Sequence, residues 1–146
     1  MSQLADSLRA ALNAARKSQE KARALVLGTI LANLKNRELE LARSPTDDEV
    51  VEVIRKGIKL RREAFEQFTK AQRNDLADVE LNQIKVLEAF LPPAVDPAEI
   101  RAAARAAIAA GATDLGRVMG VVMPQFKARA DGKLINQIVR EELQAG

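Results

Sequence analysis

Apolar residues recur every three or four positions along most of this chain, which is the spacing of one buried face of an α-helix. The first two stripes predict helices that include residues 4–15 and 27–41. Ser18 precedes the second stripe and is a candidate N-cap, because a serine hydroxyl accepts hydrogen bonds from the free amides at a helix start. A turn is expected around Pro45, since proline cannot continue a helix.

The next segment carries the pattern of a capping box, with Thr46 at the N-cap and Glu49 three positions later. The helix that it opens is expected to run to about Gln72. Its apolar positions repeat every seven residues, at Val51, Ile58 and Phe65. This repeat is typical of a helix packed along an antiparallel neighbour, and the following helix, with Asn74 as its expected cap, supplies that neighbour.

Arg61 occupies a position in the same seven-residue seam. An arginine in a seam either extends its guanidinium to water or pairs with a carboxylate. Glu80 and Glu88 are the candidate partners, and a role in clamping a ligand is the less favoured alternative.

Two consecutive prolines, Pro92 and Pro93, form the clearest boundary in the chain. Together they stop a helix and favour an extended linker. Asp96 and Pro97 then have the residue types of an N-cap and a first helical position. The helix that follows is expected to end at Gly111, since glycine suits the position after a helix.

Two shorter helices are expected in the remaining residues. Thr113 is the candidate cap of the first, which covers residues 114–123 and ends at Pro124. Asp131 is the candidate cap of the second, which covers residues 132–143.

The composition favours helices throughout. The chain has 26 Ala and 17 Leu among 146 residues, and it lacks Trp and Tyr. Ala and Leu lead the helix-propensity scale, whereas the aromatic residues that favour strands are nearly absent. The sequence therefore predicts an all-α protein, with an N-terminal four-helix unit of long antiparallel helices (residues 1–91). A Pro-Pro linker joins this unit to a small three-helix C-terminal domain (residues 96–146).

The absence of Cys and His narrows the chemistry available to the chain. It excludes disulfides, zinc–thiolate sites, iron–sulfur clusters and haem held by histidine. It also excludes a cysteine nucleophile and leaves the four serines without a histidine base. No catalytic constellation is visible, so we expect a protein without cofactor, more readily a binding module than an enzyme. A magnesium site made of carboxylates alone stays open, although the acidic residues are scattered.

No segment has the length and hydropathy of a membrane span, and the first residues lack the basic and apolar regions of a signal peptide. We therefore expect a cytoplasmic protein with no membrane partner. The formal net charge is +3, which permits binding to a polyanion without requiring it.

The densest candidate for a binding site lies near the C-terminus. Residues 114–140 contain five basic side chains and two acidic ones, a net charge of +3. A phosphate backbone would be attracted to such a region, although residue chemistry alone favours a solvated loop that Asp131 merely caps. The candidate nucleic-acid-binding residues are Arg117, Lys127, Arg129, Lys133, Asn136 and Arg140.

Two other features of this segment are better explained by packing. Gly116 and Gly120, four residues apart, are expected to allow close approach of a neighbouring helix, and they lack the surroundings of a phosphate-binding loop. Met119 and Met123 share the same spacing and are expected to fill the core.

The N-terminal unit also has an uneven distribution of charge. Residues 1–46 hold eight basic and four acidic side chains, whereas residues 47–91 hold eight basic and ten acidic ones. The basic side could follow RNA phosphates, or it could simply favour the more acidic neighbouring helices.

Five segments together give the chain a resemblance to the small bacterial YqeY-like proteins, over essentially its whole length. Members of this family share a tail domain with the B subunit of the tRNA-dependent amidotransferase. The segments that carry the resemblance are residues 46–50, 59–63, 88–92, 116–120 and 130–136.

The resemblance implies an N-terminal helical bundle, a three-helix C-terminal domain and a tail that contacts the body of tRNA. The positions that match the amidotransferase tail are Gly116, Gly120, Met123, Lys127, Arg129, Ala130, Lys133, Leu134 and Asn136. Asp131 and Gly132 depart from it, because the tail tends to have Asn-Pro there. The chain also lacks that subunit's catalytic cradle. A carbon–nitrogen ligase activity is therefore associated with this sequence only through the family.

Two functional hypotheses follow. The first is a non-catalytic module that binds tRNA, or a complex of tRNA with an enzyme, through the basic C-terminal region. The second is an adaptor that binds a protein partner through an apolar groove of the C-terminal domain, near Val118, Val122 and Phe126. The sequence leaves the oligomeric state open.

Overall fold

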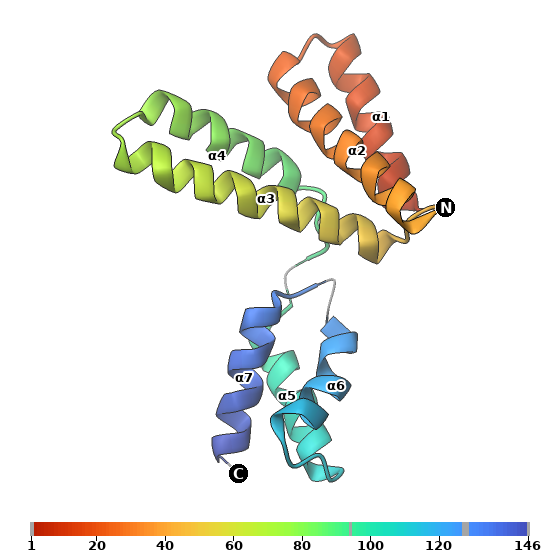
Figure 1. Cartoon of the computed structure of the whole chain (residues 1–146), viewed down its shortest axis with the longest axis vertical. Helices are drawn as coiled ribbons and strands as arrows, with labels where there is room; N and C mark the ends of the chain where they lie inside the picture. The colour runs from red at the N-terminus through yellow and green to blue at the C-terminus, as the bar shows by residue number, and fades with distance from the viewer. Residues whose placement is uncertain (1, 94, 127–128, 146) are drawn as a thin grey trace. The chain divides into compact units, whose positions relative to one another are not determined.

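The computed structural model describes residues 2–93, 95–126 and 129–145, and within them it contains seven helices and no strand. The prediction of an all-α protein is confirmed. The chain divides into two compact units, residues 1–91 (unit 1) and residues 92–146 (unit 2). The helices, coloured along the chain in Figure 1, are α1 (Gln3–Lys17), α2 (Lys21–Leu41), α3 (Asp47–Lys70), α4 (Asn74–Glu88), α5 (Pro97–Ala109), α6 (Leu115–Phe126) and α7 (Gly132–Ala145).

Unit 1 is built from two helical hairpins, α1–α2 and α3–α4, whose helices lie side by side (Figure 1). The apolar stripe of each helix faces the others, so the side chains meet in one core. Its fully buried members include Leu8, Leu27, Ile30, Ile54 and Leu87. Burial of these stripes, more than helix propensity, holds helices of this length in place.

The capping box at the start of α3 is confirmed. The backbone N–H of Glu49 donates to Thr46 Oγ1 at 3.2 Å, and the backbone N–H of Thr46 donates to Glu49 Oε1 at 3.0 Å. The Ser2 hydroxyl, which caps α1, also donates to the Asp47 carboxylate. The starts of α1 and α3 are therefore tied together by side-chain hydrogen bonds.

Two of the expected caps in unit 1 are wrong. Ser18 lies at the C-cap of α1, where its hydroxyl donates to the Ala14 carbonyl at 2.8 Å. The N-cap of α2 is Glu20, which makes no capping hydrogen bond through its side chain. Asn74 is the first residue of α4 and not its cap, a position that Arg73 takes. In both cases the residue types correctly indicated a break between two helices, but the predicted start of the second helix was one or two residues away from the observed one.

Arg61 is half-buried between α3 and α4, but neither expected glutamate pairs with it. Its Nε donates to Gln83 Oε1 at 2.9 Å, and Nη1 donates to the Gly57 carbonyl at 3.0 Å. Burial lowers its pKa, and the charge of Glu80 opposes that shift. The neighbouring Arg62 is the residue that pairs with Glu88.

Unit 2 packs three short helices around a core of smaller side chains, with Ile100, Val118 and Ile135 at its centre. The start of α5 is as predicted, since Asp96 accepts from the Ala98 N–H at 2.9 Å and proline occupies the first helical position. Gly111 follows α5 with φ +111°, a backbone conformation that residues with a Cβ rarely adopt.

The bounds predicted for α6 are wrong at both ends. Asp114, not Thr113, accepts a hydrogen bond from the helix start, through the Arg117 N–H at 2.8 Å. Pro124 lies inside the helix, which continues to Phe126. Phe126 is only 5% exposed in the unit 2 core, so burial of its ring offsets the hydrogen bond that proline removes.

Candidate nucleic-acid interface

The basic residues of α7 lie on the side of the helix opposite its buried stripe. Lys133 and Arg140 are seven residues apart and so lie on one face, with Asn136 beside them. The Arg140 Nε donates to Asn136 Oδ1 at 2.7 Å, which holds the guanidinium along this face. Ile135, Ile138 and Val139 point the other way, into the core. Among the described residues, neither Lys133 nor Arg140 makes an ion pair.

Asp131 fixes the start of this face. The Lys133 N–H donates to Asp131 Oδ1 at 3.0 Å, which confirms Asp131 as the cap of α7. Gly132, the first helical residue, lies close to α6: a Cβ added there would come within 3.1 Å of Met123 Cε. A larger residue at position 132 would therefore require the end of the Met123 side chain to shift by a few tenths of an ångström.

Arg129 lies between α6 and α7, at the same end of α7 as Lys133. Its Nη2 donates to the Gln125 carbonyl at 3.2 Å, and its guanidinium lies 5.4 Å from the centre of the Phe126 ring. A cation at the end of a helix is favoured by the helix dipole, so Arg129 has a structural role. An arginine has five N–H donors, and Arg129 uses one of them here.

The structure does not place Arg117 near Arg129 at the end of α6. Arg117 is in the first turn of α6, nine residues before Phe126, which corresponds to about 14 Å along the helix. Its Nε lies 3.6 Å from Asp114 Oδ2, and this local pair satisfies part of its charge. Lys127, the remaining predicted residue, lies outside the described residues.

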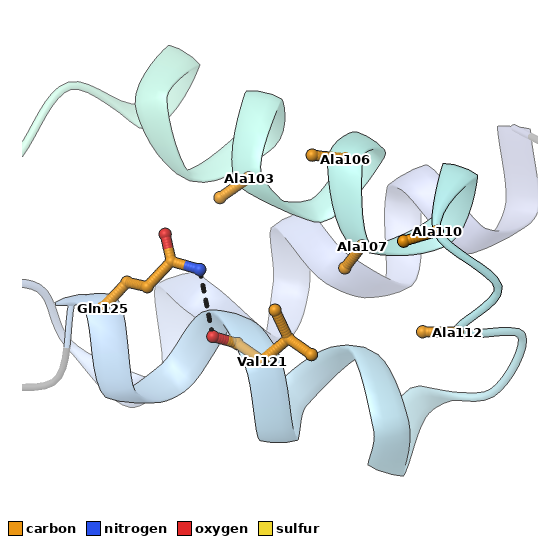
Figure 2. Close-up of a pocket in the computed structure, with 7 residues that line it drawn as sticks. All are labelled: Ala103, Ala106, Ala107, Ala110, Ala112, Val121 and Gln125. Carbon is orange, nitrogen blue, oxygen red and sulfur yellow. Dashed lines mark hydrogen bonds between the residues drawn. The ribbon is translucent and has the colours of Figure 1, made fainter.

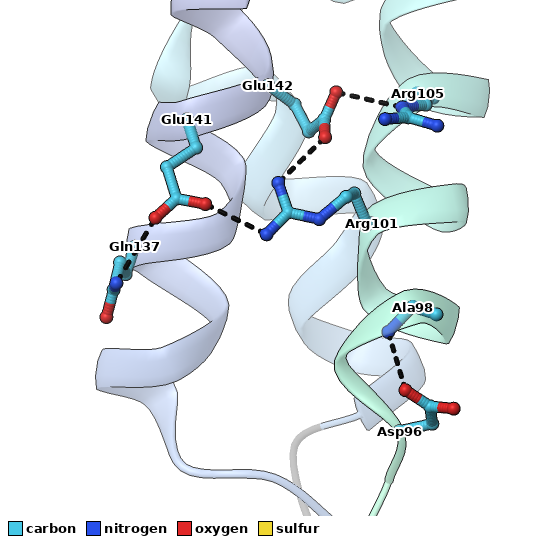
Figure 3. A network of polar contacts seen from close by, with 7 residues as sticks. All are labelled: Asp96, Ala98, Arg101, Arg105, Gln137, Glu141 and Glu142. Carbon is cyan, nitrogen blue, oxygen red and sulfur yellow. Dashed lines mark hydrogen bonds and ion pairs between the residues drawn. The ribbon is translucent and has the colours of Figure 1, made fainter.

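The side of α7 that faces α5 carries an ionic network that the sequence analysis missed. Figure 3 shows Arg101 and Arg105 of α5 converging on Glu142 of α7, each with a nitrogen–oxygen distance of 2.9 Å. Arg101 also reaches Glu141 at 2.9 Å, and Gln137 donates to the same carboxylate at 3.2 Å. The i, i+4 spacing of the two arginines and the adjacent glutamates were the available signals, but their pairing depends on the packing of α5 against α7.

This network lowers the pKa of both of its glutamates. Hydrogen bonds from Arg105 and then Arg101 lower the pKa of Glu142, whose side chain is only 7% exposed. Hydrogen bonds from Arg101 and then Gln137 lower the pKa of Glu141. Positive charge on α5 is thus neutralised by α7, whereas the face that contains Lys133 and Arg140 keeps its charge.

The three apolar residues near which an exposed docking groove was expected, Val118, Val122 and Phe126, instead belong to the core of unit 2. Val118 and Val122 are fully buried and Phe126 nearly so. A different groove, of about 340 Å³, runs between α5 and α6 (Figure 2). It is lined by Ala103, Ala106, Ala107, Ala110, Ala112, Val121 and Gln125.

The glycines of α6 do not serve the packing role that was expected within this unit. Gly116 and Gly120 are exposed, and a Cβ added at Gly120 would meet nothing within 4 Å. Met119 and Met123, in contrast, are partly buried against the core, as predicted.

In the described part of the chain, no three acidic side chains come together in a way that could hold a metal ion. The same residues include no helix long and apolar enough to cross a membrane.

Comparison with known proteins gives matches over most of the chain. An uncharacterized protein of Schizosaccharomyces pombe is 41% identical over 76 residues, which cover 52% of this chain and 62% of that protein. "Altered inheritance of mitochondria protein 41, mitochondrial" of Pyrenophora tritici-repentis is 30% identical over 140 residues, 92% of this chain and 77% of that protein. The protein of the same name from Kluyveromyces lactis is 29% identical over 58% of this chain and 46% of its own length.

These relatives are fungal and give no support to a bacterial origin, and the names of two of them contain the word mitochondrial. The cytoplasmic location expected from the sequence is not confirmed by them. The matched region spans less than two thirds of the S. pombe and K. lactis proteins. A sequence model of the family described as Yqey-like protein matches residues 5–143, nearly the whole chain. The chain therefore belongs to the YqeY-like protein family.

Proposed function

We propose that this protein is a non-catalytic module that binds tRNA, or tRNA held by an enzyme, through the exposed face of α7 and the adjoining end of α6. The observation that carries the proposal is the exposed position of Lys133 and Arg140 on one helix face, without ion-pair partners among the described residues. Arg129 precedes α7 by three residues and adds a third cation, whose guanidinium contacts the end of α6. Cations held in this way are free to pair with phosphates and to release the counterions that surround a nucleic acid.

The side chains of this face indicate how RNA would be recognised. Reading of single-stranded bases depends on exposed aromatic rings, on which the bases stack. Phe126 is buried in unit 2, and the three other phenylalanines of the chain are half-buried in unit 1. Contacts to phosphates and to the shape of a folded RNA are therefore favoured, and tRNA is such an RNA.

The test compares the affinity of full-length variants for total tRNA at several salt concentrations. The variant Arg129→Gln/Lys133→Gln/Arg140→Gln removes three charges from the proposed face. The control, Lys56→Gln/Lys59→Gln/Lys70→Gln, removes three exposed charges from α3, where the described residues give these lysines no ion pair. Circular dichroism verifies that both variants fold.

We expect the first variant to bind tRNA about tenfold more weakly than the unmodified chain. We also expect it to reduce the slope of log affinity against log salt by about 2, because each lost phosphate contact removes about 0.7–0.9 from that slope. The control should bind like the unmodified chain. Equal affinity of both variants, or binding that salt does not weaken, contradicts the proposal.

A second candidate function is that of an adaptor for a protein partner, and the groove of Figure 2 favours it. Val121 is 47% exposed at the edge of this alanine-lined groove. The substitution Val121→Glu places a charge there with little effect on the core. A protein partner is captured with the unmodified chain and with this variant after nuclease treatment. If the variant no longer retains a stoichiometric partner while its tRNA binding is unchanged, the result favours the adaptor.

A further inference from the structure

A second concentration of positive charge lies in unit 1, at the turn between α1 and α2. Residues 7–37 contain seven basic side chains and a single acidic one, Glu20. Arg9 and Arg37 have carboxylate partners, at 3.2 and 3.1 Å. Among the described residues, Arg16, Lys17 and Lys21 have none. We call these three exposed residues the basic turn.

The backbone brings the three cations together by reversing direction over a short stretch. Gln19 adopts φ 61°, and the Glu20 N–H donates to the Ala15 carbonyl at 2.9 Å. The last turn of α1 is thereby placed next to the first turn of α2 (Figure 1). The Glu20 carboxylate lies 2.8 Å from the Ser18 hydroxyl, which shares its single hydrogen between this carboxylate and the Ala14 carbonyl. No cation of the basic turn lies within ion-pair distance of Glu20.

Helix stability explains only part of this arrangement. Arg16 and Lys17 lie in the last turn of α1, where the helix dipole favours a cation. Lys21 lies in the first turn of α2, where the same dipole disfavours one, and that turn contains no acidic residue. A residue that acts against local stability without a compensating contact is often retained for binding.

The surroundings of the basic turn fit a polyanion better than a lipid surface. Leu25, one helical turn after Lys21, is 64% exposed, but it is followed on the same face by Thr29 and Ala32. Helices that lie on membranes need a broad apolar face in addition to their charges.

We propose that the basic turn is a second surface for the phosphate backbone of RNA, so that each of the two units contacts the same RNA. This inference rests on the proposed function for its partner but on different residues for its site. Leu91 packs against the core of unit 1 and Val95 against that of unit 2. Because three residues connect them, an RNA bound to one unit stays at a high effective concentration for the other.

The experiment uses the full chain and total tRNA, with the same salt series. The variant Arg16→Gln/Lys17→Gln/Lys21→Gln is compared with the α7-face variant, with the combination of the two and with the α3 control. We expect the basic-turn variant to lose about tenfold in affinity and about 2 units of salt slope. The combined variant should lose more than either alone.

The outcomes distinguish the second RNA surface in unit 1 from the proposed RNA-binding face of α7. If the basic-turn variant binds like the unmodified chain while the α7-face variant is weakened, the second surface is overturned and the proposed function stands. If only the basic-turn variant is weakened, the second surface stands and the α7 face is overturned. Absence of binding by the unmodified chain overturns both. Loss of binding to phosphatidylserine-containing vesicles, with tRNA affinity unchanged, assigns the turn to membranes and overturns the second surface.

Discussion

Units 1 and 2 are both helical, but they are stabilised by different kinds of contact. The core of unit 1 includes five buried leucines, whereas the described residues of the unit 2 core include none and consist of Ala, Val, Ile and Phe126. Unit 2 instead places Glu142 between Arg101 and Arg105, which joins α5 to α7. Unit 1 has side-chain hydrogen bonds at helix starts, as in the capping box of Thr46, and between α3 and α4, where Arg61 donates to Gln83.

The difference follows from size. A small unit buries a smaller fraction of its apolar surface, so polar contacts between its helices matter more to its stability. The same network pairs the cations of α5, whereas Lys133 and Arg140 of α7 have no ion-pair partner among the described residues. The contrast thus bears on function as well as on stability.

The largest expected effect comes from matched truncations in the two cores. Leu27→Ala in unit 1 and Ile135→Ala in unit 2 each remove a fully buried side chain. Each should destabilise its own unit by about 2–5 kcal/mol, through lost burial and the cavity left behind. Hydrogen exchange measured by mass spectrometry reads each helix separately. If both substitutions increase exchange equally in both units, the contrast between two separately stabilised units is wrong.

The next largest expected effect is the loss of stability in acid, which should differ between the polar contacts of the two units. The folded pKa of Glu142 lies below its ordinary value of 4.5, so its stabilisation is present above pH 4.5 and is lost as pH falls through the folded pKa. In unit 1, the hydrogen bond from Arg43 is the main cause that lowers the pKa of Glu49 to about 2. We expect acid to weaken unit 2 through Glu142, and unit 1 through Glu49 between pH 4.5 and 2.

Two isosteric variants measure these contributions by urea unfolding at pH 6 and pH 3. Glu142→Gln should lower the stability of unit 2 at pH 6 and reduce its further loss at pH 3. Glu49→Gln should do the same for unit 1 alone. An acid response of unit 2 that is unchanged in Glu142→Gln would show that other carboxylates control it.

The smallest effects, opposite in sign, come from one glycine in each unit. A Cβ at Gly57 would lie 2.7 Å from Ile30 Cδ1 and 3.2 Å from Arg61 Nη1, so Gly57→Ala should destabilise unit 1 by about 1–3 kcal/mol. A Cβ at Gly120 would meet nothing, so Gly120→Ala should stabilise α6 by about 0.5–1 kcal/mol. Thermal unfolding measures both. A destabilising Gly120→Ala would contradict the open surroundings of that residue.

Much of the fold could be predicted because its signals are local. The capping box at Thr46 and the N-caps at Asp96 and Asp131 depend on residues within three positions, and the structure confirms them. One boundary that failed, the end predicted for α6, depended on distant contacts. Pro124 did not end α6, because the ring of Phe126 is buried by residues of other helices.

The candidate site was predictable only in part, for the same reason. The spacing of Lys133 and Arg140 on one helix fixes their common face whatever surrounds them. Arg117 was predicted to join Lys133 and Arg140 because it is close to them in sequence. It lies in the first turn of α6, whereas Arg129 follows the end of that helix. The prediction of a groove near Val118 was wrong because the spacing of apolar residues marks one face of a helix but does not show whether other helices bury that face.

The sequence by itself determined the helical class, the helix starts at Thr46, Asp96 and Asp131, and the excess of basic residues, because composition, periodicity and capping act within a few residues of the chain. Only the tertiary structure decided which charges are neutralised. Arg101 and Glu142 are 41 residues apart and pair because α5 packs against α7, whereas Arg16, Lys17 and Lys21 gain no such partner. Coulombic attraction depends on distance in space, and packing of the helices sets that distance.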